Sequence, residues 1–212
     1  MPYFIALFLS VSLLSGCQTA YYSAMEKVGV YKRDIMVDRV EDANQAQQNA
    51  QKQFTSALDG LKALNQFNGG DLESAYQDID SQYQSSEAAV KNVNDRIAAI
   101  EDVANAMFEE WQQELSLYKS ANLKRDSQRK LQTTKVSYNK MLSAMKRAEK
   151  KMEPVLDTLR DNTLYLKHNL NAAAIGSLQG QFNALQTEIS GAIRDMNNAI
   201  AESNRFIGHL KK

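Results

Sequence analysis

The amino-acid sequence predicts an all-α protein, an elongated antiparallel four-helix coiled-coil bundle that follows an N-terminal signal peptide. Three observations support this prediction. Apolar residues recur in alternating steps of four and three, helix breakers are scarce (nine glycines and two prolines in 212 residues), and the few breaks separate segments of similar length. A 3.5-residue apolar repeat keeps one face of a helix against its neighbours, so it indicates long supercoiled helices and not strands.

The N-terminal segment predicts a lipid anchor. Its apolar run over residues 3–14 is about 12 residues long, the length of a signal-peptide core and well below the roughly 20 that a membrane-spanning helix needs. The run ends in Leu14-Ser15-Gly16-Cys17, which resembles the lipobox of bacterial lipoproteins. The resemblance implies that a signal peptide over residues 1–16 is removed and that acyl chains are attached to the sulfur and the new amine of Cys17. Several acyl chains together are enough for stable anchoring.

The residue after the cysteine indicates which membrane holds the anchor. Gln18 resembles the outer-membrane default of bacterial lipoproteins, whereas aspartate at this position marks retention at the inner membrane in some bacteria. We therefore expect the protein at the periplasmic face of the outer membrane. The inner membrane is the alternative.

The mature chain, residues 17–212, is expected to form a single helical bundle with helices at about 20–67, 71–119, 122–171 and 177–210. The segment Asn68-Gly69-Gly70-Asp71 should end one helix and cap the next, because glycine accepts a left-handed conformation and aspartate accepts hydrogen bonds from free helix amides. The first three helices are about 48–50 residues long, near 73 Å. Matched lengths joined by tight turns favour antiparallel neighbours.

The apolar repeat is clearest in the second and fourth helices. Of the fourteen positions reached in steps of four and three from Leu72 to Tyr118, twelve are apolar or aromatic. The same steps run from Leu178 to Leu210, beside a second row at Ile193, Ile200 and Ile207 that indicates more than one neighbour. The expected core positions of the other two helices are Met36, Val40, Ala43, Ala50, Phe54, Ala57, Leu61 and Leu64, and Leu131, Tyr138, Leu142, Met145, Met152, Leu156, Leu159, Leu166 and Leu170.

Charge is unevenly distributed although the 25 basic and 25 acidic residues cancel. Residues 71–114 carry eleven acidic and two basic side chains, and residues 124–151 carry ten basic and two acidic ones. Folding the third helix back on the second predicts three ion pairs, Asp95–Lys146, Glu101–Lys140 and Glu110–Lys130. The alternative is that residues 124–151 form a basic patch for lipid headgroups or nucleic acid. Zero net charge argues against a nucleic-acid partner, because neutralising phosphates requires excess positive charge.

The usual equipment for catalysis is missing from the sequence. It has no glycine-rich phosphate loop, neither His168 nor His209 has an acidic residue three positions before it, and the one cysteine is assigned to the lipid. We therefore predict a protein that is not an enzyme and has no catalytic residue, cofactor or metal. Aromatic residues on the repeat (Tyr76, Tyr83, Trp111, Tyr118) are interpreted as core and not as a ligand box. His168 is interpreted as a donor to carbonyls at a helix end, with a binding site there as the alternative.

Several blocks in the same order resemble a bacterial family, domain of unknown function 2959, over nearly all of the mature chain. They are Lys32-Arg33-Asp34 with Val37-Asp38-Arg39-Val40, Gly69-Gly70-Asp71-Leu72-Glu73, Phe108-Glu109-Glu110-Trp111, Ala148-Glu149 with Met152-Glu153-Pro154-Val155-Leu156, and Leu166-Lys167-His168-Asn169-Leu170-Asn171-Ala172. The resemblance implies a helical envelope protein and supplies no activity. Some members carry a DNA repair ATPase label, and this sequence lacks the phosphate loop that such an activity requires.

The predicted function is that of a lipid-anchored periplasmic coiled-coil protein with a structural or protein-interaction role in the cell envelope. Its expected partners are the membrane, through the lipid, and another envelope protein. The alternative is a bundle that holds a lipid or another amphiphile along its apolar seam, suggested by the double apolar row of the fourth helix. An enzyme whose site only the fold assembles is the least favoured hypothesis.

Overall fold

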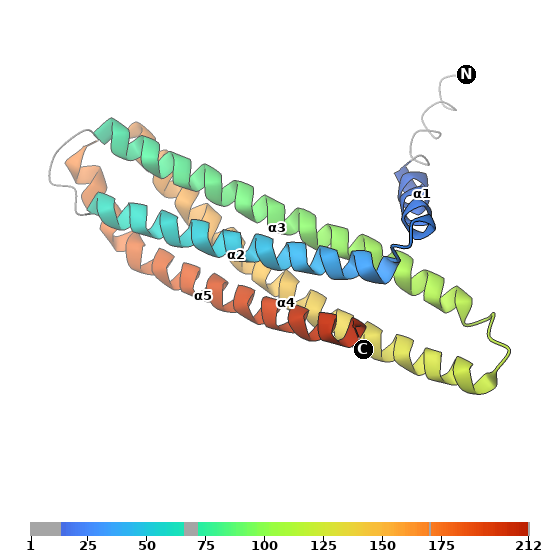
Figure 1. Ribbon diagram of the computed structural model, residues 1–212. Helices are drawn as coiled ribbons and strands as arrows, with labels where there is room; N and C mark the ends of the chain where they lie inside the picture. The colour runs from blue at the N-terminus through green and yellow to red at the C-terminus, as the bar shows by residue number, and fades with distance from the viewer. Residues whose placement is uncertain (1–13, 66–71, 170, 212) are drawn as a thin grey trace, which may run out of the picture.

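The computed structural model describes residues 14–65, 72–169 and 171–211, and that part of the chain contains five helices and no strand. The helices are α1 (Leu14–Lys27), α2 (Lys32–Asn65), α3 (Leu72–Glu114), α4 (Ala121–His168) and α5 (Ala172–Leu210). Figure 1 shows α2 to α5 running side by side in an elongated bundle, while α1 turns away from it at one end. The predicted all-α bundle of long helices is confirmed.

The four long helices form a ring in chain order. Helix α2 packs against α3 and α5, and α4 packs against the same two helices. Residue numbers rise along α2 as they fall along α3, because Lys32 pairs with Glu110 and Asp42 pairs with Arg96. Figure 1 shows the same reversal at each following helix. The bundle is therefore antiparallel between ring neighbours.

The apolar repeat forms one continuous core. In α2 all eight expected core positions are buried, and Phe54 is completely covered. In α5 every position of the repeat is buried except Phe182, which is partly buried against the core. Burying a large apolar side chain contributes about 1.5–3 kcal/mol, so this core is the main stabilising feature of the bundle. The expected core position Leu170 lies outside the described residues.

The expected first helix, at about 20–67, is wrong in one respect, because the chain breaks it into α1 and α2. Gly29 has a φ of 86°, a left-handed conformation that ends a helix. The amides of Val28 and Val30 both donate to the carbonyl of Met25 at 3.1 and 3.0 Å, which closes the last turn of α1. The predicted turn at Asn68–Asp71 lies outside the described residues.

The end of α3 and the start of α5 also differ from the expected bounds. Helix α3 ends at Glu114 and not at 119, so Tyr118 leaves the repeat and is 42% exposed in the turn. The interpretation of Tyr118 as core is therefore wrong. Helix α5 begins at Ala172 and not at 177, because the helix accommodates Gly176 without a break. Tyr76, Tyr83 and Trp111 pack partly buried against the core as expected.

Of the three predicted ion pairs between α3 and α4, none forms with the expected partner. Lys146 meets Glu101 at 2.6 Å instead of Asp95, and Asp95 pairs with Lys91 on its own helix at 2.6 Å. Lys140 instead lies 3.7 Å from Glu202 on α5. The connection over 115–120 is six residues long and not the tight turn around Ala121 that the prediction assumed, so the facing residues of α3 and α4 differ from the expected ones. The expected pairs Glu101–Lys140 and Glu110–Lys130 are accordingly absent from the described residues.

Candidate functional site

The bundle is open at the end where α2 begins and α5 stops. Helices α3 and α4 continue beyond that point and leave a cavity of about 720 Å³ between the four helix ends. Binding sites for small ligands typically enclose about 300–1,000 Å³, so the cavity has the size of a ligand site. Its walls come from all four long helices: Tyr31, Lys32, Arg33, Met107, Glu110, Trp111, Glu114, Asp126, Arg129, Lys130, Thr133, Thr134, His209 and Leu210.

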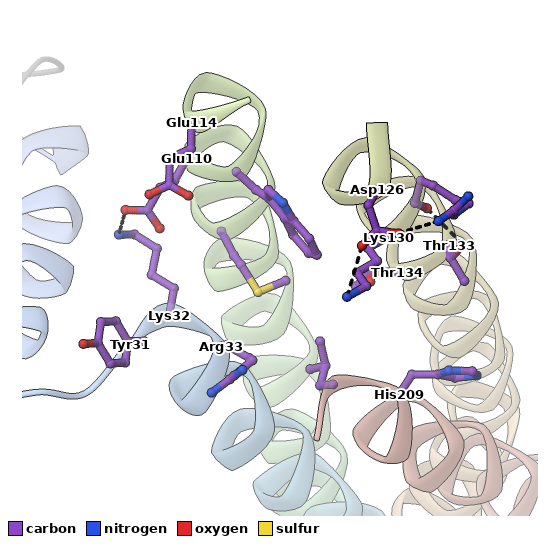
Figure 2. A pocket seen from close by; sticks show the side chains of 14 residues that line it. Tyr31, Lys32, Arg33, Glu110, Glu114, Asp126, Lys130, Thr133, Thr134 and His209 are labelled. Atoms are coloured by element: carbon purple, nitrogen blue, oxygen red, sulfur yellow. Dashed lines mark hydrogen bonds and ion pairs between the residues drawn. The ribbon is translucent and has the colours of Figure 1, made fainter. Parts of the chain in front are cut away.

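Lys32, the first residue of α2, joins three helices at this end. Its Nζ donates to Glu110 of α3 at 2.8 Å and to Glu26 of α1, as the pair with Glu110 in Figure 2 shows. The same ammonium lies 5.8 Å from the ring centroid of Tyr22. Burial alone would lower the pKa of Lys32, but the hydrogen bonds to both carboxylates outweigh it and the pKa is raised. Lys32 therefore stays charged and holds α1 and α3 to the start of α2.

Trp111 lines the cavity. Its indole Nε1 donates to Ser127 Oγ at 2.8 Å, which links the last turns of α3 to the first turns of α4. Ser127 is buried, whereas Trp111 is only partly covered and presents part of its ring to the cavity. Since Trp111 is the only tryptophan in the chain, its fluorescence reports directly on this site.

One wall of the cavity is basic. Asp126 accepts hydrogen bonds from Arg129 and lies 3.4 Å from Lys130 on the same helix. These hydrogen bonds, first from Arg129 and then from Lys130, lower the pKa of the Asp126 carboxyl. Figure 2 shows Lys130 on α4 opposite Arg33 at the start of α2. One carboxylate shared between two cations leaves positive charge on this side of the cavity.

The chemistry of the walls suits an amphiphilic guest. Met107, Trp111 and Leu210 supply apolar lining, and the charged lining includes both cations (Lys32, Arg33, Arg129, Lys130) and carboxylates (Glu110, Glu114, Asp126). An apolar body could rest on the apolar lining while an anionic group reaches the cations. Within the described residues no group of three or more His, Cys, Asp or Glu side chains is arranged to hold a metal ion.

Cys17, the predicted lipid site, lies within α1 by its backbone. Nothing is described of its side chain, and most of the predicted signal peptide (1–13) lies outside the described residues. Helix α1 joins α2 through the turn at Gly29, so the chain brings Cys17 to the same end of the bundle as the cavity. Across the described residues, no helix combines the length and the apolar character that crossing a bilayer requires.

His168 lies at the opposite end and is exposed. The expectation that it bonds to helix-end carbonyls is wrong, because Asn169 does so: its backbone amide donates to Leu166 O at 3.1 Å and its side chain to Tyr165 O at 3.0 Å. The other histidine, His209, lines the cavity and was not singled out by the sequence. The position of His209 in the last turn of α5 could have indicated that it lies at the open end of the bundle.

A family model described as "Protein of unknown function (DUF2959)" matches residues 21–210, nearly the whole chain. The match agrees with the resemblance carried by the sequence blocks. No curated protein and no solved structure matches the chain. The comparisons therefore identify the family and leave the activity to be argued from the site.

Proposed function

The chain belongs to the DUF2959 family, whose description names no activity, and we propose that it is a lipid-anchored helical rod with a structural or protein-interaction role in the bacterial cell envelope. In this proposal the acyl chains on Cys17 tether α1 to the outer membrane at its periplasmic face, and the bundle recruits another envelope protein. The proposal assigns no chemical step to the chain.

The observation that carries the proposal is the arrangement of the open end. Helix α1, which contains the lipobox cysteine, is fastened to the bundle through Lys32, and the cavity opens at the same end. Along the rest of their length, α2 to α5 pack around an apolar core. A rod of α4's 48 residues extends for about 72 Å at 1.5 Å per residue. A tether at one end of such a rod would hold the cavity close to the membrane.

The anchor is tested by metabolic labelling with a palmitate analogue in a Gram-negative host. The chain contains a single cysteine, so label in the protein should depend entirely on Cys17. We expect Cys17→Ala to abolish labelling. The matched control Ser15→Ala keeps a small residue in the lipobox and should be labelled normally. Label that persists in Cys17→Ala would refute the anchor.

The interaction role is tested by photo-crosslinking in intact cells. A photoreactive amino acid at Thr133, an exposed residue of the cavity wall, should capture a discrete envelope partner. The same group at Asn183, exposed near the far end of α5, is the control and should capture none. Equal capture at both positions, or capture at neither, would contradict a partner site at the open end.

The cavity also favours a second function, binding of a lipid or another amphiphile. The sequence suggested binding along the whole apolar seam, whereas we now place the binding site at one end of the bundle. There, apolar and basic side chains line the cavity of about 720 Å³. Titration with a long-chain fatty acid should shift the emission of Trp111, and Arg129→Gln combined with Lys130→Gln should weaken the response. A purified protein that is empty by native mass spectrometry and silent in this titration would exclude the second function.

A further inference from the structure

The turn between α3 and α4 combines exposed apolar side chains with unpaired cations. Leu117 is 76% exposed and Leu123 is 61% exposed, and Tyr118 lies exposed between them. Scattered exposed apolar residues are normal on protein surfaces. Here, however, six of the nine large hydrophobic side chains that are exposed among the described residues lie in two segments at one end, residues 21–31 and 117–123. Such a concentration indicates a contact surface.

The exposure of Leu117 is built into the turn. Leu115 is only 4% exposed and packs into the core, held by its backbone hydrogen bond to Trp111 O at 3.2 Å. The next amides close a tight turn, with Leu117 N donating to Glu114 O at 2.9 Å. Ser120 then caps α4 by accepting from the amide of Leu123 at 3.4 Å. The turn thus buries one leucine and holds the next apolar residues outward.

The charged side chains of the same turn are all basic. Residues 115–125 contain Lys119, Lys124 and Arg125 and no acidic residue. Lys119 and Lys124 form no ion pair with any residue that the structure describes, and Arg125 donates only to the neutral side chain of Asn122 at 2.6 Å. Other cations of α4 do pair with carboxylates, as Lys146 does with Glu101 and Arg160 does with Asp157. The positive charge of this turn is therefore available to an outside partner.

We propose that residues 117–125, the α3–α4 tip, insert into the surface of an anionic lipid bilayer. Leucine and tyrosine side chains gain free energy at the boundary between headgroups and acyl chains, and lysine and arginine remain among the anionic headgroups. A protein partner would match the apolar residues but would need acidic groups placed against three cations at the very tip. The bilayer satisfies both requirements without a specific shape. The contact is independent of the lipid on Cys17 and places a second membrane contact at the end of the bundle that carries α1.

The test uses the mature chain, residues 17–212, with its only cysteine removed by Cys17→Ala. An environment-sensitive dye is attached at Tyr118→Cys in the tip or, as a control reporter, at Val136→Cys, which is 68% exposed on the side of α4. Vesicles containing phosphatidylglycerol should shift the emission of the tip dye to the blue and leave the control dye unchanged. Vesicles of phosphatidylcholine alone should act far more weakly, and added salt should weaken the effect of the anionic vesicles.

Matched variants separate the two contributions. Lys119→Gln with Lys124→Gln should weaken vesicle binding by about 25-fold, taking about fivefold for each cation near an anionic surface. Lys150→Gln with Lys151→Gln, two exposed cations of α4 away from the tip, should leave it unchanged. Leu117→Ser with Leu123→Ser should weaken binding by at least about tenfold, whereas Leu164→Ser, at the opposite end, should not.

Three outcomes would overturn the proposal. The first is an equal dye shift at Tyr118 and Val136, which would indicate binding through another part of the chain. The second is no shift at Tyr118 on anionic vesicles. The third is a shift that grows with protein concentration without vesicles, which would assign the tip to a contact between two copies. None of these outcomes bears on palmitate labelling of Cys17, so failure of the tip and failure of the anchor are distinguishable.

Discussion

Gln47 lies in the middle of α2 with a completely buried side chain, and neither its amide oxygen nor its amide nitrogen has a hydrogen-bond partner in the structure. It occupies a position of the apolar repeat, four residues after Ala43 and three before Ala50, both fully buried. A polar side chain at such a position loses its water without replacing the hydrogen bonds. We therefore predict that replacing Gln47 by methionine stabilises the bundle.

The magnitude follows from the two unpaired atoms. A buried polar group without a partner costs about 1–3 kcal/mol, and methionine has nearly the length and volume of glutamine, so it should fill the same space without strain. We expect Gln47→Met to raise the free energy of unfolding by about 2 kcal/mol. With a urea dependence of about 2 kcal/mol per molar, the unfolding midpoint should rise by about 1 M.

The assay is urea unfolding followed by circular dichroism, with Gln48→Met as the matched control. Gln48 is exposed one residue further on, so its replacement should change the free energy of unfolding by less than about 0.5 kcal/mol. A lower midpoint for Gln47→Met than for the parent chain would refute the reasoning and show that the amide is satisfied in solution. Equal gains at both positions would show that the effect is only helix propensity.

Four further predictions concern the charged and strained positions. Burial, and then the charge of Glu101, raise the pKa of Tyr138 to about 12 in the folded protein. The folded protein therefore loses stability as the pH rises from about 10, the pKa of an exposed tyrosine, to about 12, and Tyr138→Phe should reduce this loss. Unfolding midpoints measured against pH check this prediction. Burial raises the pKa of Glu149, so Glu149→Gln should raise the melting temperature at pH 7, with an advantage that shrinks as the pH falls through that raised pKa. A double-mutant cycle of Lys32→Met and Glu110→Gln should give a coupling of about 1 kcal/mol in thermal unfolding, and no coupling would contradict the pairing. Gly29→Ala should cost about 1 kcal/mol, because its φ of 86° is strained for alanine although space is open, and hydrogen exchange should show faster opening of α1 but not of the bundle core.

The bundle could be predicted well because burying one face of each helix requires apolar residues at a regular spacing, and this spacing is visible in one sequence. Each apolar step from Met36 to Leu64 is local information, and all those positions are buried. The cavity could not be predicted in the same way. It depends on where α2 begins and α5 ends relative to α3, and it joins Arg33 to His209 from opposite ends of the chain.

The ion pairs failed for a related reason. The pairing of Glu101 with Lys146 depends on the exact path of residues 115–120, and a small change in a connection displaces every facing pair along two long helices. The sequence comparison matched the acidic residues of α3 only with the basic residues of α4. It therefore could not pair Lys32 of α2 with Glu26 on α1 and Glu110 on α3. Charge asymmetry along the sequence indicated complementarity, but the partners followed from geometry.

The single ammonium group of Lys32 has a mechanical consequence. Because it binds Glu26 and Glu110 together, any force that pulls α1 away from the rod must break an ionic contact that also secures α3. The Lys32 side chain is only 11% exposed, while those of Glu26 and Glu110 are 31% and 40% exposed, so dissolved ions reach this joint mainly from the side of the carboxylates. A load on the N-terminal helix is therefore passed to two long helices at once.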